Sequence, residues 1–188
     1  PFLTPFKMCL FVAVFLSMPV ILYQIWGFIA PGLYRKEKRF AFPLLLSSIL
    51  LFYAGVAFAH FVVFPLMFAF FATAAPEGVT MMTDISAYLD FILTIFFAFG
   101  IAFEVPIATV MLVWSGLVSI ETLRKARAFV FLGAFVAGML LTPPDAISQT
   151  LLAVPVYLLY ESGLVLAKVL GLGRAPLEDS QEEKTPDA

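Results

Sequence analysis

Charged residues are scarce in this chain of 188 amino acids: Asp, Glu, Lys and Arg make up 13% of it, whereas hydrophobic residues make up 62%. A soluble domain carries about 25% charged residues, because its outer surface must be covered with polar groups. The composition therefore excludes a cytosolic enzyme, a disordered chain and a nucleic-acid-binding protein. It indicates an integral membrane protein.

Metal-ligating and redox-active side chains are almost missing. Cys9 is the only cysteine, His60 is the only histidine, and asparagine is absent. A single cysteine cannot form an intrachain disulfide, and a zinc site built from several Cys or His residues is excluded. We therefore expect no metal ion and no cofactor. The sequence also lacks a nucleophile–base pair and a phosphate-binding loop, so we expect no enzymatic activity.

Five apolar stretches dominate the chain, and short polar connections separate them. They cover residues 6–29, 40–71, 88–114, 129–141 and 146–160, with residue 170 as the outer limit of the last. None shows the alternation of a strand, and backbone groups in lipid must bond to one another, so each stretch is predicted to be a helix. We predict an all-α polytopic membrane bundle of five transmembrane helices over residues 1–170. A polar, acidic and disordered tail is expected over residues 171–188.

Basic residues mark alternate connections between these stretches. They are Arg35, Lys36, Lys38 and Arg39 in the first, Arg124, Lys125 and Arg127 in the third, and Lys168, Arg174 and Lys184 at or beyond the last helix. The positive-inside rule then places the first and third connections and the C-terminus in the cytoplasm. Lys7 is the one exception. This topology puts Pro1 outside, at what reads as the end of a loop. We therefore expect the chain to be a fragment that lacks its first helix.

The fourth stretch is short, because as a helix it spans only about 20 Å of the ~30 Å hydrocarbon core. It either reaches the far surface by thinning the bilayer or forms a re-entrant hairpin with the fifth stretch. The basic residues fit both alternatives, and we favour the short hairpin that reaches the far surface.

Pairs of small residues at a spacing of four permit close contact between membrane helices. Three such pairs occur, at Gly55/Ala59, Ala98/Ala102 and Gly133/Ala137. Because pairs of this kind arise by chance in alanine-rich helices, they do not by themselves predict which helix faces meet.

Glu104 is the most informative polar residue, because it lies near the middle of the third stretch. An ionised carboxylate there costs several kcal/mol unless it faces protein or water. One interpretation is a polar contact for a partner helix or a hydrated groove. The other is a structural hydrogen bond within the bundle. A lone acid does not make a proton pathway, since a relay would need further partners.

Two other acids lie in connections. Glu37 stands among four basic residues, and its carboxylate either belongs to a solvated loop or binds a guanidinium in bidentate fashion. Asp145 ends the turn 142–145 and is predicted to cap the following helix. Met139, Thr142 and Gln149 around this turn can form a polar patch that binds a partner helix.

Four sequence blocks follow one another along the chain: residues 19–39, 61–66, 103–106 and 133–152. Together they resemble the TatC family of the twin-arginine protein translocase. The resemblance implies a glove-shaped bundle of six helices, of which five would remain here, in the bacterial inner membrane with a cytoplasmic C-terminus. It also implies a receptor and core subunit without enzymatic activity.

The resemblance further implies the partners and the residues that meet them. The family binds twin-arginine signal peptides of folded precursors, recruits TatA-type and TatB-type single-helix subunits, and exports proteins with the proton-motive force. Homo-oligomers and contacts with membrane lipids are implied, and nucleic acid is not. The implied residues are Glu37, Arg35, Leu33 and Phe28 for signal-peptide binding, Glu104 as the intramembrane polar residue, Met139, Thr142 and Gln149 for partner-helix docking, and Pro143, Pro144 and Asp145 for the periplasmic turn.

Two other functions compete with this one. A proton-coupled small-molecule transporter would use Glu104 as its coupling carboxylate, but the chain lacks the internal repeats and paired broken helices typical of such proteins. A non-catalytic membrane scaffold would bind other helices without any preference for arginine pairs.

Overall fold

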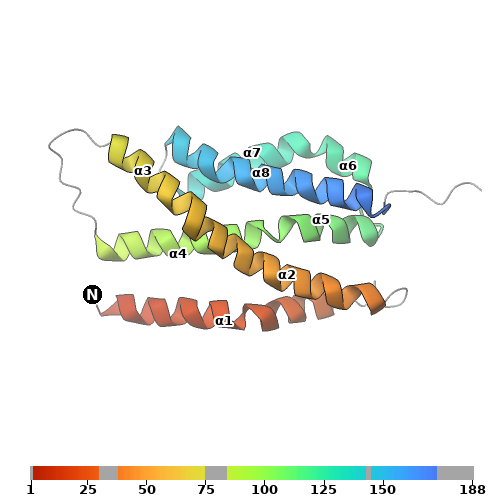
Figure 1. Ribbon diagram of the computed structural model, residues 1–188, viewed down its shortest axis with the longest axis horizontal. Helices are drawn as coiled ribbons and strands as arrows, with labels where there is room; N and C mark the ends of the chain where they lie inside the picture. The colour runs from red at the N-terminus through yellow and green to blue at the C-terminus, as the bar shows by residue number, and fades with distance from the viewer. Residues whose placement is uncertain (1, 30–37, 75–83, 143–144, 173–188) are drawn as a thin grey trace, which may run out of the picture.

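The computed structural model describes residues 2–29, 38–74, 84–142 and 145–172. Within these ranges the regular structure is helical (Figure 1). The helices are α1 (Leu3–Ile29), α2 (Lys38–Phe58), the π-helical turn η2 (Ala59–Val63), α3 (Phe64–Ala74), α4 (Ile85–Ala102), α5 (Val105–Trp114), α6 (Ile120–Lys125), α7 (Arg127–Leu141) and α8 (Ala146–Val169). Four segments are long and apolar enough to cross a membrane, and α7 is a shorter apolar helix. The predicted all-α membrane architecture is therefore confirmed.

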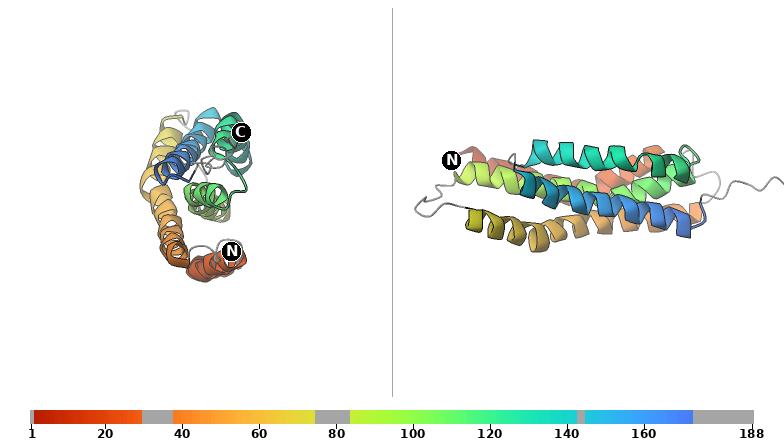
Figure 2. Two further views of the ribbon diagram at one scale, coloured as in Figure 1. Left: turned by 90° about the vertical axis from the view of Figure 1, so that its right-hand side faces the viewer. Right: turned by 90° about the horizontal axis from the view of Figure 1, so that it is seen from above.

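The long helices run along one common axis (Figure 1). Helix α5 packs against α8, α7 packs against α8, and α2 packs against α4. The segment α2–α3 crosses the others diagonally, and α1 lies beyond it at the edge of the bundle (Figure 1). Seen end-on, the helices follow an open arc rather than a closed ring (Figure 2). The arrangement leaves α1 as the least covered of the long helices, with a single side against α2 and α4.

The second long segment changes its helical type at η2 but does not end there. Proline has no N–H, and its ring collides with the carbonyl four residues earlier, which for Pro65 is that of Phe61. A π-helical turn just before the proline widens the backbone and relieves that collision. Apolar helix therefore continues over Phe42–Ala74, which confirms the long stretch expected at 40–71.

The third long segment is interrupted once, at Phe103 and Glu104. Pro106 occupies the second position of α5, where a missing N–H costs nothing. Both residues at the joint keep right-handed helical angles, with φ of −70° and −75°. Helices α4 and α5 therefore continue in nearly one direction (Figure 1), and the joint holds Glu104 inside the segment.

Helices α7 and α8 form an antiparallel hairpin of unequal arms (Figure 1). Helix α7 has 15 residues and is about 22 Å long, whereas α8 has 24 residues and is about 36 Å long. The fifth stretch thus extends to Val169, close to its outer limit. At this hairpin, α7 ends and α8 begins short of the end that α1 and α4 reach (Figure 1). Whether the turn meets the far membrane surface stays a prediction.

Helices α2 and α4 approach each other through two glycines. A β-carbon at Gly55 would lie 2.4 Å from the carbonyl oxygen of Phe99, and one at Gly100 would lie 2.6 Å from Cε2 of Phe52. Real β-carbons do not come that close to other atoms, so only glycine fits at either position. Phe52 and Phe99 are themselves fully buried. The two helices are therefore locked in one register.

An ion pair joins α1 to α4 near the beginnings of both helices. Lys7 Nζ lies 3.1 Å from Asp90 Oδ2, and both side chains are partly exposed. Lys7 was the exception to the alternation of basic connections. Its charge is balanced by an acid from another helix, which explains why a lysine is tolerated at this end.

Candidate functional site

Three places in the bundle concern the polar residues that the sequence singled out. One is the end that carries Arg124, Lys125, Arg127 and Lys168, called here the basic end. The second is the joint between α4 and α5, and the third is the turn of the α7–α8 hairpin at the opposite end (Figure 1).

At the basic end, α1 finishes next to the first connection. Phe28 lies in its last turn and its side chain is 87% exposed. Leu33, Arg35 and Glu37 lie outside the described residues, so their prediction as a binding group stays open. The described part of this site is an uncovered aromatic side chain beside the connection that contains Glu37. Such a side chain is available for an apolar ligand segment.

At the joint, the Glu104 carboxylate is held by α2. The Ser48 hydroxyl donates a hydrogen bond to Glu104 Oε2, across 56 positions of sequence. Ser48 is fully buried, and the acid is partly buried. The second carboxylate oxygen, Oε1, is buried and receives no hydrogen bond from any described residue. Oε2 therefore takes part in a contact between two helices. Oε1 can still accept a hydrogen bond from a donor outside the described residues.

The sequence reasoning missed Ser48. The signal was a pair of serines, Ser47 and Ser48, in an otherwise apolar stretch. Ser47 donates to the carbonyl oxygen of Pro43 in its own helix at 2.8 Å, which is the ordinary arrangement for a serine in a membrane helix. Ser48 points instead into the bundle, and sequence alone does not distinguish the two.

In the hairpin, Asp145 caps α8 as predicted. Its Oδ2 accepts a hydrogen bond from the Ser148 amide at 2.8 Å. Asp145 Oδ1 and the Ser148 hydroxyl are buried, and neither has a hydrogen-bond partner among the described residues. Pro143 and Pro144 lie outside the described residues. The hairpin therefore carries an acid and a hydroxyl whose bonding capacity is only partly used.

The expected docking patch of Met139, Thr142 and Gln149 is divided by the structure. Thr142 is buried and donates to the Gly138 carbonyl oxygen at 2.7 Å. Gln149 donates to the Phe135 carbonyl oxygen at 2.7 Å and so joins α8 to α7. Met139 alone is exposed, at 57%. Thr142 thus closes the last turn of its own helix, Gln149 joins the two arms of the hairpin, and Met139 is the most exposed of the three.

A further polar cluster links α7 to α8 closer to the basic end. Arg127 Nη2 lies 2.7 Å from Glu161 Oε2, and the Tyr157 hydroxyl donates to Glu161 Oε1 at 3.0 Å. The sequence reasoning missed this pairing as well, because the partners are 34 positions apart. Within the described ranges, no group of His, Cys, Asp and Glu residues could hold a metal ion. The Arg127–Glu161, Ser48–Glu104 and Gln149–Phe135 contacts each join two helices of the bundle. Polar groups of this kind are suited to recognition.

Known proteins resemble the chain over most of its length. Residues 1–155 match the family described as "Sec-independent protein translocase protein (TatC)". A relative of that description from Azotobacter chroococcum mcd 1 is 65% identical over 164 residues, covering 87% of this chain and 64% of the relative. One from Escherichia coli K12 is 58% identical over 175 residues, covering 93% and 68%. A crystal structure described as "Twin Arginine Translocase Receptor- TatC" superposes with a TM-score of 0.81 at 40% identity, covering 91% of this chain and 75% of that one.

The matches agree with the expectations drawn from the sequence. The chain spans 64% of the length of the Azotobacter relative and 68% of that of the Escherichia relative. All four resembling blocks lie inside the matched residues 1–155. The bundle is that of a multi-pass membrane protein, and the family is one of transport components, as expected for a chain without enzymatic activity. The chain belongs to the TatC family of Sec-independent protein translocase proteins.

Proposed function

We propose that the chain acts as the receptor and core subunit of a twin-arginine translocase in the bacterial inner membrane. It binds the signal peptides of folded precursors and assembles with TatA-type and TatB-type single-helix subunits, and transport uses the proton-motive force. The family match over residues 1–155 carries this proposal, because those residues include all of the candidate site residues.

Signal-peptide recognition is proposed for the basic end. Glu37 accepts the guanidinium groups of the twin arginines, because a carboxylate binds arginine in a bidentate, charge-assisted manner. Arg35 and Leu33 belong to the same connection. The exposed Phe28 then packs against the apolar stretch that follows the arginines in the ligand. The positive-inside rule supports a cytoplasmic position for this end and for the C-terminus.

Partner helices are proposed to dock at two further places. Glu104 Oε1, buried and unpartnered among described residues, accepts a hydrogen bond from a donor on a partner helix. The exposed Met139 provides an apolar contact on the hairpin, where Asp145 Oδ1 is the second unused acceptor. A proton-coupled transporter fits less well, because a proton relay needs several ionisable groups. Among the described residues, Glu104 bonds to the Ser48 hydroxyl and to no ionisable side chain.

A photo-crosslinker at Phe28 tests the recognition step. Membranes that contain the chain with its partner subunits receive a twin-arginine signal peptide or its twin-lysine variant. We expect crosslinking to the arginine form, and a loss of about tenfold or more in the Glu37→Gln variant, because one charge-assisted pair is removed. The yield of crosslinked product is measured by immunoblot.

Glu121→Gln is the matched control for this experiment, since Glu121 is an exposed acid in α6, near the same end of the bundle. It should leave the yield unchanged. Equal crosslinking of the arginine and lysine peptides would remove Glu37 from the proposed role and favour a scaffold without arginine preference. An equal loss of crosslinked product in both glutamate variants would show that the yield depends on the overall charge and not on Glu37 in particular.

A further inference from the structure

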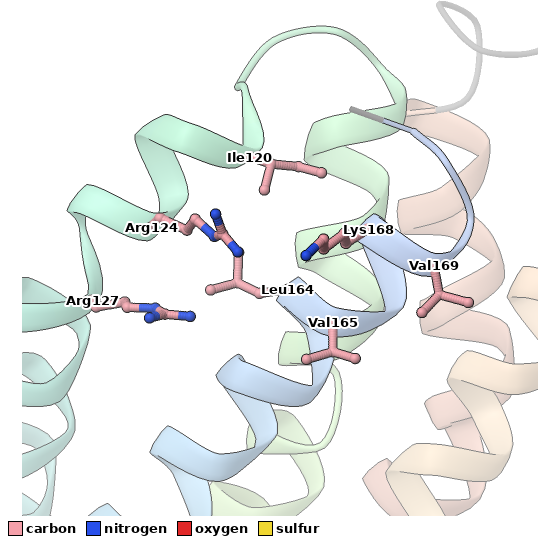
Figure 3. Close-up of a pocket in the computed structure, with 7 residues that line it drawn as sticks. All are labelled: Ile120, Arg124, Arg127, Leu164, Val165, Lys168 and Val169. Atoms are coloured by element: carbon pink, nitrogen blue, oxygen red, sulfur yellow. The ribbon is translucent and has the colours of Figure 1, made fainter. Parts of the chain in front are cut away.

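A pocket of about 410 Å³ opens at the basic end, between α6, the start of α7 and the last turns of α8 (Figure 3). Three cationic side chains line it: Arg124, Arg127 and Lys168. All three point toward the same space from three different helices (Figure 3). Among the described residues, no acidic side chain lines the pocket. Like charges are thus brought together around one space, with one of them, Arg127, paired with Glu161.

Two of the three cations are uncompensated. Arg127 is paired with Glu161 at 2.7 Å, and this bond occupies one of its guanidinium nitrogens. Arg124 and Lys168 have no hydrogen bond or ion pair with any described residue. A guanidinium and an ammonium that face one space form a natural site for a phosphate group, which accepts several charge-assisted hydrogen bonds.

The rest of the pocket is apolar. Leu164 forms its buried base, and Val165 and Val169 line its side, with exposed fractions of 58% and 76%. Both valines belong to α8, which is long and apolar enough to cross the membrane. The pocket therefore joins a cationic group to exposed valines of an apolar helix. A ligand that fits both parts has an anionic head and a hydrocarbon body.

We propose that this pocket binds the phosphate headgroup of an anionic glycerophospholipid. The phosphate contacts Arg124 and Lys168, and the acyl chains lie along the exposed face of α8. A free phosphate ion would satisfy the cations but would leave the apolar side of the pocket unused. Basic pockets between membrane helices are a recognised form of lipid-headgroup site. The inference does not depend on the proposed receptor function.

Lipid binding to the intact purified chain in detergent tests the proposal. Native mass spectrometry measures the dissociation constants of phosphatidylglycerol and of phosphatidylcholine. We expect phosphatidylglycerol to bind more tightly, and Arg124→Gln/Lys168→Gln to weaken its binding by about 30-fold, since each direct hydrogen bond to the phosphate contributes about fivefold. Both side chains are exposed and unpaired among described residues, so their loss should leave the fold intact.

Lys125→Gln is the matched control for Arg124→Gln, because Lys125 is an exposed cation of the same helix that does not line the pocket. It should change phosphatidylglycerol binding by less than about twofold, because Lys125 makes no direct contact with the phosphate. Equal weakening by the two single variants would overturn the proposal in favour of diffuse charge attraction. Equal binding of the two lipids would also overturn it. Inorganic phosphate that displaces the lipid from the unaltered chain at equal concentration would assign the pocket to a free anion instead.

Discussion

Replacing Gly55 with alanine is expected to lower the free energy of unfolding of the bundle by about 3 kcal/mol. The added methyl carbon would lie 2.4 Å from the Phe99 carbonyl oxygen and 3.0 Å from Cβ of Phe103. The first of these atoms belongs to the backbone of α4 and cannot rotate away as a side chain can. Helices α2 and α4 must separate, and the packing of the buried Phe52 and Phe99 is lost with them.

The same substitution at Gly133 is the control, and it should act in the opposite direction. No atom lies within 4 Å of a β-carbon built at Gly133. Alanine in a helix interior is more favourable than glycine by up to about 1 kcal/mol. Unfolding of both variants by SDS from mixed micelles gives the two free energies. Equal destabilisation at Gly133 would show that the loss of a glycine in either helix, and not contact between α2 and α4, controls the result.

The second large effect is expected at Ser48. Its change to alanine deletes a single oxygen atom and removes the only donor that the described structure provides to Glu104. The carboxylate then lies in the bundle with both oxygens unpartnered, at an expected cost of about 2 kcal/mol. Adding Glu104→Leu removes the unsatisfied acid and should restore most of the stability, because replacing both partners of a hydrogen bond by apolar groups is nearly neutral.

This double variant separates the two interpretations of Glu104. If Oε1 accepts a bond from a partner helix, Ser48→Ala/Glu104→Leu regains stability but exports a folded twin-arginine reporter about fivefold more slowly, since one interhelical bond in lipid is lost. Export is measured by the periplasmic fraction of the reporter. Normal export by the stable double variant would leave Glu104 with a structural role alone.

The membrane helices could be predicted because spanning the bilayer requires about 20 apolar residues, which composition and run length reveal directly. Contacts between helices could not. Gly55/Ala59 and Gly133/Ala137 have the same spacing, yet Gly55 touches the backbone of α4 and Gly133 faces open space. The difference depends on how each helix is rotated against its neighbours, and that rotation is a property of the whole bundle.

The candidate site divides in the same way. Asp145 was predictable as a cap, because capping is local and depends on neighbouring residues. The bonds of Thr142 and Gln149 to backbone carbonyls of α7 could not be predicted from the sequence. Their docking roles stay predictions. The role of Ser48 could not be predicted because its partner, Glu104, is 56 positions away. Polar side chains in an apolar stretch are worth marking even when their partners are unknown.

The ion pair between Lys7 and Asp90 has a consequence for biosynthesis, because its two members are 83 positions apart. At a translation rate of 5–20 residues per second, Asp90 emerges roughly 4–17 s after Lys7. With the basic end in the cytoplasm, as proposed, Lys7 must cross the bilayer during that interval as an unpaired cation. Helix α1 therefore inserts with an unfavourable charge, which is neutralised only when α4 packs beside it. The final position of α1 is reached only after the middle of the chain has been synthesised.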